Sequence, residues 1–244
     1  MALVAASMSG VSATFPVLAG RAVHAALLDL DDTLVDRTAA FRRWLEDLMA
    51  RKPDAFAAPA ADLAALLEID DRGRRDRRAF YEALLDRHPV LRAAGLDPEG
   101  IQADIVARLP LVVMPDPLVV AAVERLRARG VRLAVVTNGS SSNQRQKLAR
   151  SGVEHLLDAV IVSGELGISK PDPEIFARAL AAIGAKAEDT LFVGDDPRRD
   201  IVGAGDVGIR TVWVSHGDAW PVGPDYPPPT GTVRAIADLD EVFA

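Results

Sequence analysis

The 244-residue sequence contains no cysteine, which excludes disulfide bonds, thiolate metal sites and a cysteine nucleophile. It contains no apolar run that approaches the roughly 18 to 20 residues of a membrane-spanning helix, so no membrane partner is expected. It also lacks an excess of basic residues, because 28 Lys and Arg stand against 35 Asp and Glu and leave a net charge of −7. That balance argues against a nucleic-acid partner, since phosphate contacts need clustered positive charge. The lack of cysteine is compatible with a cytoplasmic location, which is our expectation.

The first 20 residues are rich in Ala, Ser, Val and Gly and have some features of an export signal. However, no positive charge precedes the first apolar residues, and Ser7, Ser9 and Ser12 interrupt the apolar run. We therefore interpret residues 1–20 as a flexible N-terminal extension, with a signal peptide as the less favoured alternative. The hydrophobic share of 49% is enough for a sizeable core, in one large domain or in a core with a smaller second domain.

A short apolar run ends abruptly in acids at residues 25–32. Ala25 to Leu28 has the length and composition of a buried parallel strand, and three acids follow within four positions, at Asp29, Asp31 and Asp32. Side chains alternate along a strand, so Asp29 and Asp31 are expected to point the same way. Crowded carboxylates cost stability unless a cation or a proton relieves their repulsion. This stretch therefore predicts a functional site.

The stretch that follows has helical rather than strand periodicity. Apolar side chains recur at a spacing of three and four residues, and Pro53, Pro89 and Pro110 interrupt the pattern. The pattern predicts four amphipathic helices with no strand between them, which would form a small bundle with its own core. The four apolar stripes cover residues 41–49, 63–67, 80–85 and 101–109.

From Asp116 onward, short apolar strands alternate with helical patterns. This alternation predicts βαβ units and an α/β fold class, here a Rossmann-like parallel sheet flanked by helices. The helical bundle is then an insertion, residues 36–114, into a core formed by residues 21–35 and 115–244. An edge strand and a final helical turn are expected within residues 233–243. The other predicted strands are residues 131–136, 159–162, 191–193 and 210–214.

Chemically unusual residues follow several of these strands. Besides Asp29 and Asp31, they are Thr137, Lys170 in the loop after the strand 159–162, and Asp195. Ligands of open α/β sheets bind at the carboxyl ends of the strands, which would gather these residues at one rim. Each residue alone has an ordinary structural explanation, as a turn hydroxyl, a solvated charge or a helix cap. Their joint occurrence in this order favours a shared site.

Four segments that contain these residues resemble, in order, the motifs of the haloacid dehalogenase superfamily of aspartate-nucleophile hydrolases. The first is Asp-Leu-Asp-Asp-Thr-Leu at 29–34, which matches the family pattern Asp-x-Asp-x-Thr-Leu. The others are an apolar strand ending in a hydroxyl residue at 135–139, a lysine shortly before a helix at 167–173, and a Gly-Asp with further acids at 193–201. The resemblance covers essentially the whole chain after residue 24. It implies an α/β core and a mobile helical cap, inserted after the first motif, that closes over the site and excludes bulk water.

The resemblance also implies a role for each acid. Asp29 would be the nucleophile that forms an aspartyl-phosphate, and Asp31 would protonate the leaving oxygen and later take a proton from the hydrolytic water. Asp31 then needs a pKa above its free value, which crowding by neighbouring acids would favour. Asp29, the backbone carbonyl of Asp31 and Asp195 would hold Mg²⁺, with Mn²⁺ as the alternative, because hard cations prefer oxygen ligands.

The second and third motifs are expected to bind the phosphoryl group. The Thr137 hydroxyl and the backbone amides of Asn138 and Gly139 can donate hydrogen bonds to phosphoryl oxygens. Lys170 would supply a positive charge beside them. These residues therefore complete the predicted phosphate site.

Two further acids of the fourth motif have supporting roles in this interpretation. Asp196 precedes Pro197 and is better explained as a helix cap than as a metal ligand. Asp200 lies one helical turn further on, where it could orient Lys170 or accept a hydrogen bond from a metal-bound water. Both are kept as candidate site residues.

The chemistry favours a Mg²⁺-dependent phosphatase that acts on a small phosphorylated metabolite. Phosphate monoesters resist attack by anions, so their hydrolysis needs the positive charges that the motifs supply. A phosphomutase of the same superfamily is an alternative. A dehalogenase is disfavoured because it has no leaving oxygen for Asp31 to protonate, and a non-catalytic binding protein because every motif residue is present. The expected assembly is a monomer or a homodimer.

The sequence of the cap does not identify the substrate. It contains five arginines between residues 72 and 78, which could contact an anionic substrate. Asp70, Asp71 and Asp76 are interleaved with them, as on an ordinary solvated helix surface, and we favour that interpretation.

Overall fold

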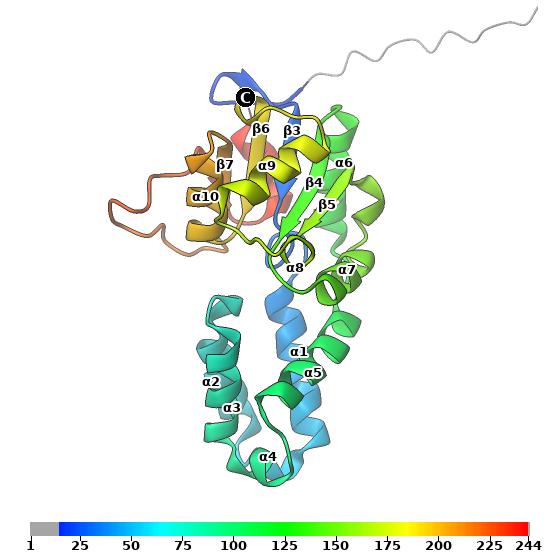
Figure 1. Ribbon diagram of the computed structural model, residues 1–244, viewed down its shortest axis with the longest axis vertical. Helices are drawn as coiled ribbons and strands as arrows, with labels where there is room; N and C mark the ends of the chain where they lie inside the picture. The colour runs from blue at the N-terminus through cyan, green and yellow to red at the C-terminus, as the bar shows by residue number, and fades with distance from the viewer. Residues whose placement is uncertain (1–14, 244) are drawn as a thin grey trace, which may run out of the picture.

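The computed structural model describes residues 15–243, and its core is a six-stranded sheet. In chain order the strands are β3 (Ala25–Leu28), β4 (Arg132–Thr137), β5 (Ala159–Val162), β6 (Thr190–Gly194), β7 (Arg210–Val214) and β8 (Gly231–Val233). All neighbours pair in parallel, in the order β5-β4-β3-β6-β7-β8 (Figure 1). The predicted α/β fold class with a parallel sheet is confirmed.

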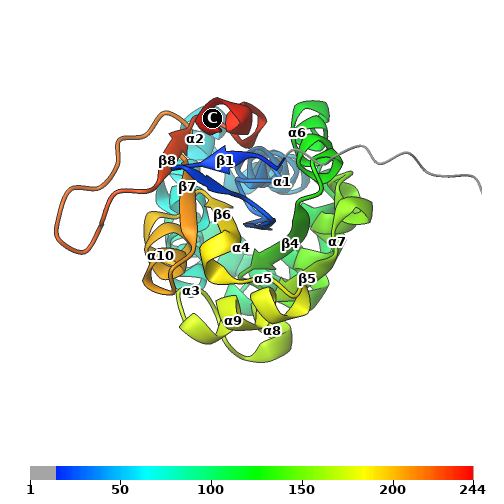
Figure 2. The ribbon, with the colours of Figure 1, turned by 90° about the horizontal axis from the view of Figure 1, so that it is seen from above.

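Helices cover both faces of this sheet, as Figure 2 shows. One face carries α6 (Pro117–Ala128) and the C-terminal η7 (Ile236–Val242), and the other carries α9 (Pro173–Ala182) and α10 (Gly203–Asp206). The central strand β3 contributes side chains to the hydrophobic cores on both faces. Ala26 and Leu28 belong to one core, and Ala25 and Leu27 belong to the other. Burial on both faces explains why this strand is a continuous apolar run in the sequence. Two further helices, α7 (Ser141–Arg150) and α8 (Ser163–Leu166), follow β4 and β5.

The register of β3 brings separate chain segments to one rim of the sheet. Leu28, the last residue of β3, is paired with Val135 of β4 on one side and with Val193 of β6 on the other. The segments that follow these three positions therefore leave the sheet at the same carboxyl-terminal rim. That rim carries the sequence motifs and faces the helical insertion (Figure 1).

The insertion between β3 and β4 is helical, and we refer to residues 37–112 as the cap. The four predicted apolar stripes lie on four of its helices. The short helix α4 is absent from the sequence-based prediction, in which Pro89 only ends a helix. Pro89 also begins the next helix, because proline is tolerated at the first helical position. The cap helices are α1 (Arg37–Arg51), α2 (Pro59–Asp70), α3 (Arg77–Arg87), α4 (Pro89–Ala93) and α5 (Pro98–Arg108).

The prediction of a flexible extension up to residue 20 is wrong for its last residues. β1 (Val17–Leu18) and β2 (Arg21–Ala22) form an antiparallel hairpin in which Leu18 is buried. The guanidinium of Arg210, on β7, donates hydrogen bonds to three backbone oxygens of the hairpin and ties it to the sheet. The rest of the predicted extension, residues 1–14, lies outside the described residues.

The C-terminal part of the chain closes the sheet edge. The edge strand and helical turn predicted for residues 233–243 are present as β8 and η7, although β8 begins at Gly231. The loop between β7 and β8 projects from the core (Figures 1 and 2). Within residues 15–243, no single helix is long and apolar enough to cross a membrane.

Candidate active site

The predicted site residues meet at the carboxyl-terminal rim of the sheet. Asp29 directly follows β3, and its N–H donates to the carbonyl of Val193 at 2.9 Å, which fixes its backbone against β6. Lys170 comes from the loop after α8, and its Nζ lies 2.5 Å from Asp29 Oδ1 and 2.7 Å from Asp200 Oδ1. All three side chains are almost fully buried. The rim thus brings together charged groups from three separate segments of the chain.

Three aspartates form a compact cluster at this rim, which we call the aspartate triad. Asp29, Asp195 and Asp200 each offer one carboxylate oxygen, and these oxygens lie within 4.8 Å of one another. Burial raises the pKa of Asp29 to about 7, against the opposing charge of Lys170. Burial, followed by the charge of Asp29, raises the pKa of Asp195 well above its ordinary value. A hard cation with oxygen ligands would offset this repulsion, so the residues present fit a divalent metal.

The position of Asp200 depends on a glycine. Asp200 Oδ2 accepts a hydrogen bond from the N–H of Asp196 at 3.0 Å. A Cβ atom at Gly194 would lie 2.3 Å from that oxygen, so the end of β6 has room only for glycine. Asp196 in turn accepts from two N–H groups at the start of η6 (Pro197–Val202) and caps it. Its carboxylate is engaged in capping and does not join the triad.

Lys170 is held in place at its backbone and at its ammonium group. Its N–H donates to Asn138 Oδ1 at 2.9 Å, and Asn138 Nδ2 donates back to the Lys170 carbonyl at 3.0 Å. Burial lowers the pKa of Lys170, but the charges of Asp200 and Asp29 outweigh burial and leave the pKa above its ordinary value. Lys170 is therefore a fixed positive charge, and the side chain of Asn138 positions it.

Asp31 has different neighbours from those that the sequence predicts. Lys147 Nζ donates to Asp31 Oδ1 at 2.5 Å, and Gln144 Nε2 donates to Asp31 Oδ2 at 3.0 Å. Burial raises the pKa of Asp31, but the charge and hydrogen bonds of Lys147 outweigh burial and leave the pKa below its ordinary value. The expectation of a raised pKa is therefore wrong for this structure, because a cation rather than another acid faces the carboxylate.

Lys147 and Gln144 are site residues that the sequence motifs miss. Both belong to α7 and are almost fully buried. Their spacing of three residues places them on one face of the helix, beside the buried Leu148. The sequence signal that could have identified them is this helix face, on which a glutamine and a lysine occupy positions where a core helix would carry apolar side chains.

The loop after β4 is partly engaged by other protein groups. Thr137 Oγ1 accepts a hydrogen bond from Gln144 Nε2 at 2.5 Å, which leaves the hydroxyl hydrogen available to a ligand. The Gly139 N–H donates to Ser163 Oγ at 2.9 Å. Ser163 therefore occupies the Gly139 amide in this structure, and donation from that amide to a phosphoryl oxygen stays a prediction.

The third acid of the first motif turns away from the triad. The carboxylate of Asp32 accepts from the N–H and from the hydroxyl of Thr38, both at 2.8 Å. Its backbone oxygen lies 2.6 Å from His216 Nε2. Asp32 thus joins the first motif to the start of α1, where the chain passes from core to cap.

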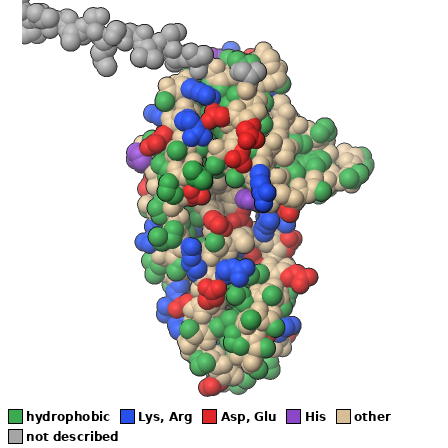
Figure 3. All heavy atoms as spheres, turned by 180° about the vertical axis from the view of Figure 1, so that it is seen from behind, with side chains coloured by type: hydrophobic (Ala, Val, Ile, Leu, Met, Phe, Trp, Pro, Cys, Tyr) green, Lys and Arg blue, Asp and Glu red, His purple; other side chains and the backbone are tan. Residues whose placement is uncertain are grey.

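A cleft of about 670 Å³ lies over the rim, between the core and the cap. Its core wall includes the triad, and its cap wall includes Arg75, Tyr81 and Gln102. Figure 3 shows acidic and basic side chains interspersed along the waist where the two parts meet. The cleft has room for a small metabolite, at the place where ligands of open α/β sheets bind.

Together these features define an α/β enzyme core with an aspartate-rich site under an inserted helical cap. A family model for haloacid dehalogenase-like hydrolases matches residues 23–208, and the chain belongs to this family. The match confirms the resemblance drawn from the four sequence motifs and the expected enzyme class, a hydrolase.

Two curated relatives are similar over most of their length. A phosphoserine phosphatase of Thermus thermophilus is 42% identical over an alignment length of 250, and the alignment covers 89% of this chain and 96% of the relative. A glyceraldehyde 3-phosphate phosphatase of Methanopyrus kandleri is 33% identical over 208 residues, which cover 80% of this chain and 85% of the relative. Both relatives are phosphatases, although they are named for different substrates.

A solved structure supports the same comparison. The HAD-type hydrolase YfnB of Bacillus subtilis, bound to magnesium, superimposes with a TM-score of 0.70 at 25% identity. The match covers 90% of this chain and 98% of that chain, and that structure is described as revealing interdomain movement. Its bound magnesium agrees with the divalent metal that the aspartate triad suggests.

Proposed function

We propose that this hydrolase is a Mg²⁺-dependent phosphatase, with Mn²⁺ as an alternative ion, that cleaves a small phosphorylated metabolite. The observation that carries the proposal is the contact of buried Lys170 with both Asp29 and Asp200, at the rim where the cleft opens. An aspartate nucleophile, a fixed cation and a group of oxygen ligands are what hydrolysis of a phosphate monoester requires. The two curated relatives, both phosphatases of small compounds, support this assignment.

In the proposed reaction Asp29 attacks phosphorus. A carboxylate oxygen of Asp29 forms a bond to phosphorus while the bond to the ester oxygen breaks, which leaves an aspartyl-phosphate and the alcohol. Lys170 reduces the repulsion between the carboxylate and the anionic phosphate, and the Thr137 hydroxyl donates to a phosphoryl oxygen. Water then attacks the aspartyl-phosphate, releases inorganic phosphate and restores Asp29.

Asp31 is the proposed acid and base. It follows Asp29 by two residues and lines the cleft, with 29% of its side chain exposed. In this structure Lys147 holds it as a carboxylate, the form that takes a proton from the hydrolytic water. Donation of a proton to the leaving oxygen needs the acid form, so the contact with Lys147 has to weaken when the substrate is bound.

The proposed metal ligands are Asp29, Asp195 and the backbone carbonyl of Asp31, with Asp200 in the same cluster. When bound, the ion supplies positive charge that screens the approach of one anion to another. The chain contributes a set of carboxylates that are already gathered at the rim, so few groups need to move when the ion binds.

The test is the release of inorganic phosphate from p-nitrophenyl phosphate by the purified protein in the presence of Mg²⁺. Asp29→Asn should reduce the release to background, because an amide is a poor nucleophile. Asp206→Asn makes the same charge change on the exposed end of α10 and should retain the wild-type rate. Phosphate release that persists in Asp29→Asn, or that continues unchanged when a chelator is added, would show that the proposed mechanism is wrong. Transfer of the phosphoryl group to a sugar instead of water would identify a phosphomutase.

A further inference from the structure

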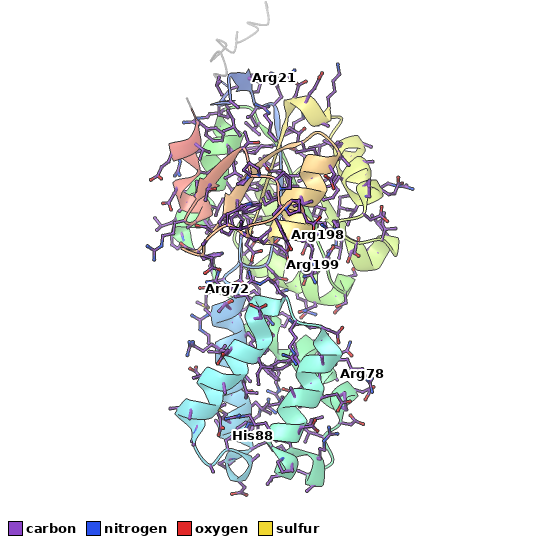
Figure 4. All side chains as sticks on the ribbon, turned by 90° about the vertical axis from the view of Figure 1, so that its left-hand side faces the viewer. Arg21, Arg72, Arg78, His88, Arg198 and Arg199 are labelled. Carbon is purple, nitrogen blue, oxygen red and sulfur yellow. The ribbon has the colours of Figure 1, made fainter. Side chains whose placement is uncertain are left out.

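On the wall of the cleft opposite the aspartate triad, arginines outnumber the single acid, Asp76. Five arginines of the cap line this wall: Arg37, Arg72, Arg74, Arg75 and Arg77. Four of them come from residues 71–77, which we interpreted from sequence as part of a solvated helix surface. In the structure this segment contains a turn, η2 (Asp71–Gly73), that joins α2 to α3 at the end of the cap nearest the core (Figure 1). Figure 4 shows Arg72 at this junction, with Arg199 of the core across from it.

Two of these arginines share a single carboxylate. Asp70 is almost fully buried and accepts hydrogen bonds from the guanidinium groups of both Arg37 and Arg77. One carboxylate neutralises only one of the two guanidinium charges. Within the part of the chain that the structure describes, Nη2 of Arg77 is buried without a hydrogen-bond partner. This part of the wall therefore keeps a positive charge and an unused donor.

Arg75 differs from its neighbours in having no acidic partner. Arg74 pairs with Asp71 at 2.8 Å, and Arg72 pairs with Asp218 at 3.4 Å. Among residues 15–243, no carboxylate forms a salt bridge with Arg75, whose exposed side chain lines the cleft. A guanidinium placed beside other guanidiniums is repelled by them, and an anion between them would relieve that repulsion.

We propose that these cap arginines bind a second anionic group of the substrate, a carboxylate or a second phosphate, at the end away from the scissile phosphoester. This rests on the proposed phosphatase function, because it takes the transferred phosphoryl group to lie beside Asp29 and Lys170. The planar fork of donors in arginine matches the oxygens of carboxylates and phosphates. A substrate with two anionic ends would meet positive charge on both walls of the cleft.

The competing explanation is that the arginines offset the acids of the core wall when the cap closes. In that case the arginines would assist every substrate equally, because their partners would belong to the protein. If the arginines bind a second anionic group of the substrate, the loss of an arginine should affect substrates that carry such a group more than substrates that lack it.

The experiment compares matched substrates in the wild-type enzyme with Mg²⁺. 3-Phosphoglycerate and glycerol 3-phosphate differ by one carboxylate, and fructose 1,6-bisphosphate and fructose 6-phosphate differ by one phosphate. The wild-type enzyme should prefer the more anionic member of at least one pair in kcat/KM, and the pair that shows it identifies the group. Arg75→Gln should reduce this preference by about tenfold, mainly through KM, because a charge-assisted hydrogen bond is lost.

Arg78→Gln is the matched control. Arg78 lies three residues further along, is 67% exposed and pairs with Glu99, and it points away from the cleft (Figure 4). Arg78→Gln should leave the preference for the more anionic substrate unchanged. Arg75→Lys should keep part of the preference that Arg75→Gln loses. Equal losses on both members of a pair in Arg75→Gln, or no preference in the wild-type enzyme, would overturn the proposal. Absence of phosphate release from every substrate, p-nitrophenyl phosphate included, would instead refute the phosphatase function on which it rests.

Discussion

Lys147 Nζ lies 2.5 Å from Asp31 Oδ1, so an ion pair joins helix α7 to the loop after the central strand. The lysine side chain is 3% exposed, whereas that of Asp31 is 29% exposed and opens onto the cleft. Gln144 adds a hydrogen bond to the other oxygen of the same carboxylate. The orientation of the proposed acid and base is therefore set by α7 and not by the first motif alone.

Lys147→Met is expected to lower kcat by about tenfold to a hundredfold, because misplacing a reacting group by about 1 Å can cost that much. Methionine keeps an unbranched side chain, one atom shorter than that of lysine, and removes the charge. The measurement is steady-state hydrolysis of p-nitrophenyl phosphate. Lys186→Met, at an exposed position after α9, is the control and should retain the wild-type kcat. A Lys147→Met enzyme that folds and turns over within twofold of wild type would exclude a role for this ion pair.

Gly194→Ala is expected to lower both stability and activity. The new Cβ would lie 2.3 Å from Asp200 Oδ2 and 2.6 Å from its Cγ, so the carboxylate that contacts Lys170 has to move. Overpacking of this kind costs about 1–3 kcal/mol of the free energy of unfolding. Chemical denaturation measures the first effect, and kcat with p-nitrophenyl phosphate measures the second.

Gly205→Ala provides the matched control for that substitution. Gly205 belongs to α10, and a Cβ there meets no atom within 4 Å. It should be neutral or slightly stabilising, because alanine is a better helix former than glycine. If Gly194→Ala behaved in the same way as Gly205→Ala, Asp200 would not depend on the glycine at the end of β6.

The elements that build the site are predictable from sequence where burial dictates the residue type. β3, buried on both faces, must be apolar, so its four residues and the acids that follow mark one rim of the sheet. The same reasoning applies to β4 and β6, whose ends carry Thr137 and Asp195. A buried parallel strand is a continuous apolar run in the sequence, so the end of the strand can be predicted from the residue at which the run stops.

The residues that act through tertiary contacts are not predictable in this way. Lys147 and Gln144 approach Asp31 only because the fold places α7 against the loop after β3, which the spacing within α7 does not reveal. The orientation of residues 71–77 is likewise set by the turn after α2, where Asp71 and Arg72 have positive φ. Alternating charges in sequence do not distinguish a solvated helix surface from a turn that faces a cleft.

Asp70→Ala is expected to destabilise the cap. Asp70 and Arg37 form an ion pair with side-chain exposures of 2% and 8%, and removal of the carboxylate leaves the guanidinium buried without that partner. Breaking such a pair costs about 3–5 kcal/mol. Urea denaturation monitored by circular dichroism measures this loss.

Glu99→Gln is the control for Asp70→Ala, because it removes the acid from the exposed pair with Arg78. Exposed ion pairs are screened by water and contribute little, so its unfolding midpoint should match that of wild type. A loss in Asp70→Ala no larger than in Glu99→Gln would mean that Arg37 finds another partner or reaches solvent in the variant.

Magnesium is expected to raise the melting temperature of the wild-type protein. An ion that binds only the folded state adds about 2.7 kcal/mol at a hundred times its Kd, which for a chain of this size corresponds to roughly 5 to 10 °C. Asp195→Asn should raise the melting temperature in the presence of a chelator, because it removes one of the three repelling carboxylates of the triad.

The same variant should lose most of the magnesium-dependent shift, so the order of stability of the two proteins reverses between chelator and saturating Mg²⁺. Asp206→Asn, which makes the same charge change outside the triad, should melt like wild type in both conditions, and added NaCl at matched ionic strength controls for screening. A similar magnesium shift in Asp195→Asn and wild type would place the ion somewhere other than the triad. The reversal cannot arise from a general effect of charge, because Asp206→Asn would then show it too.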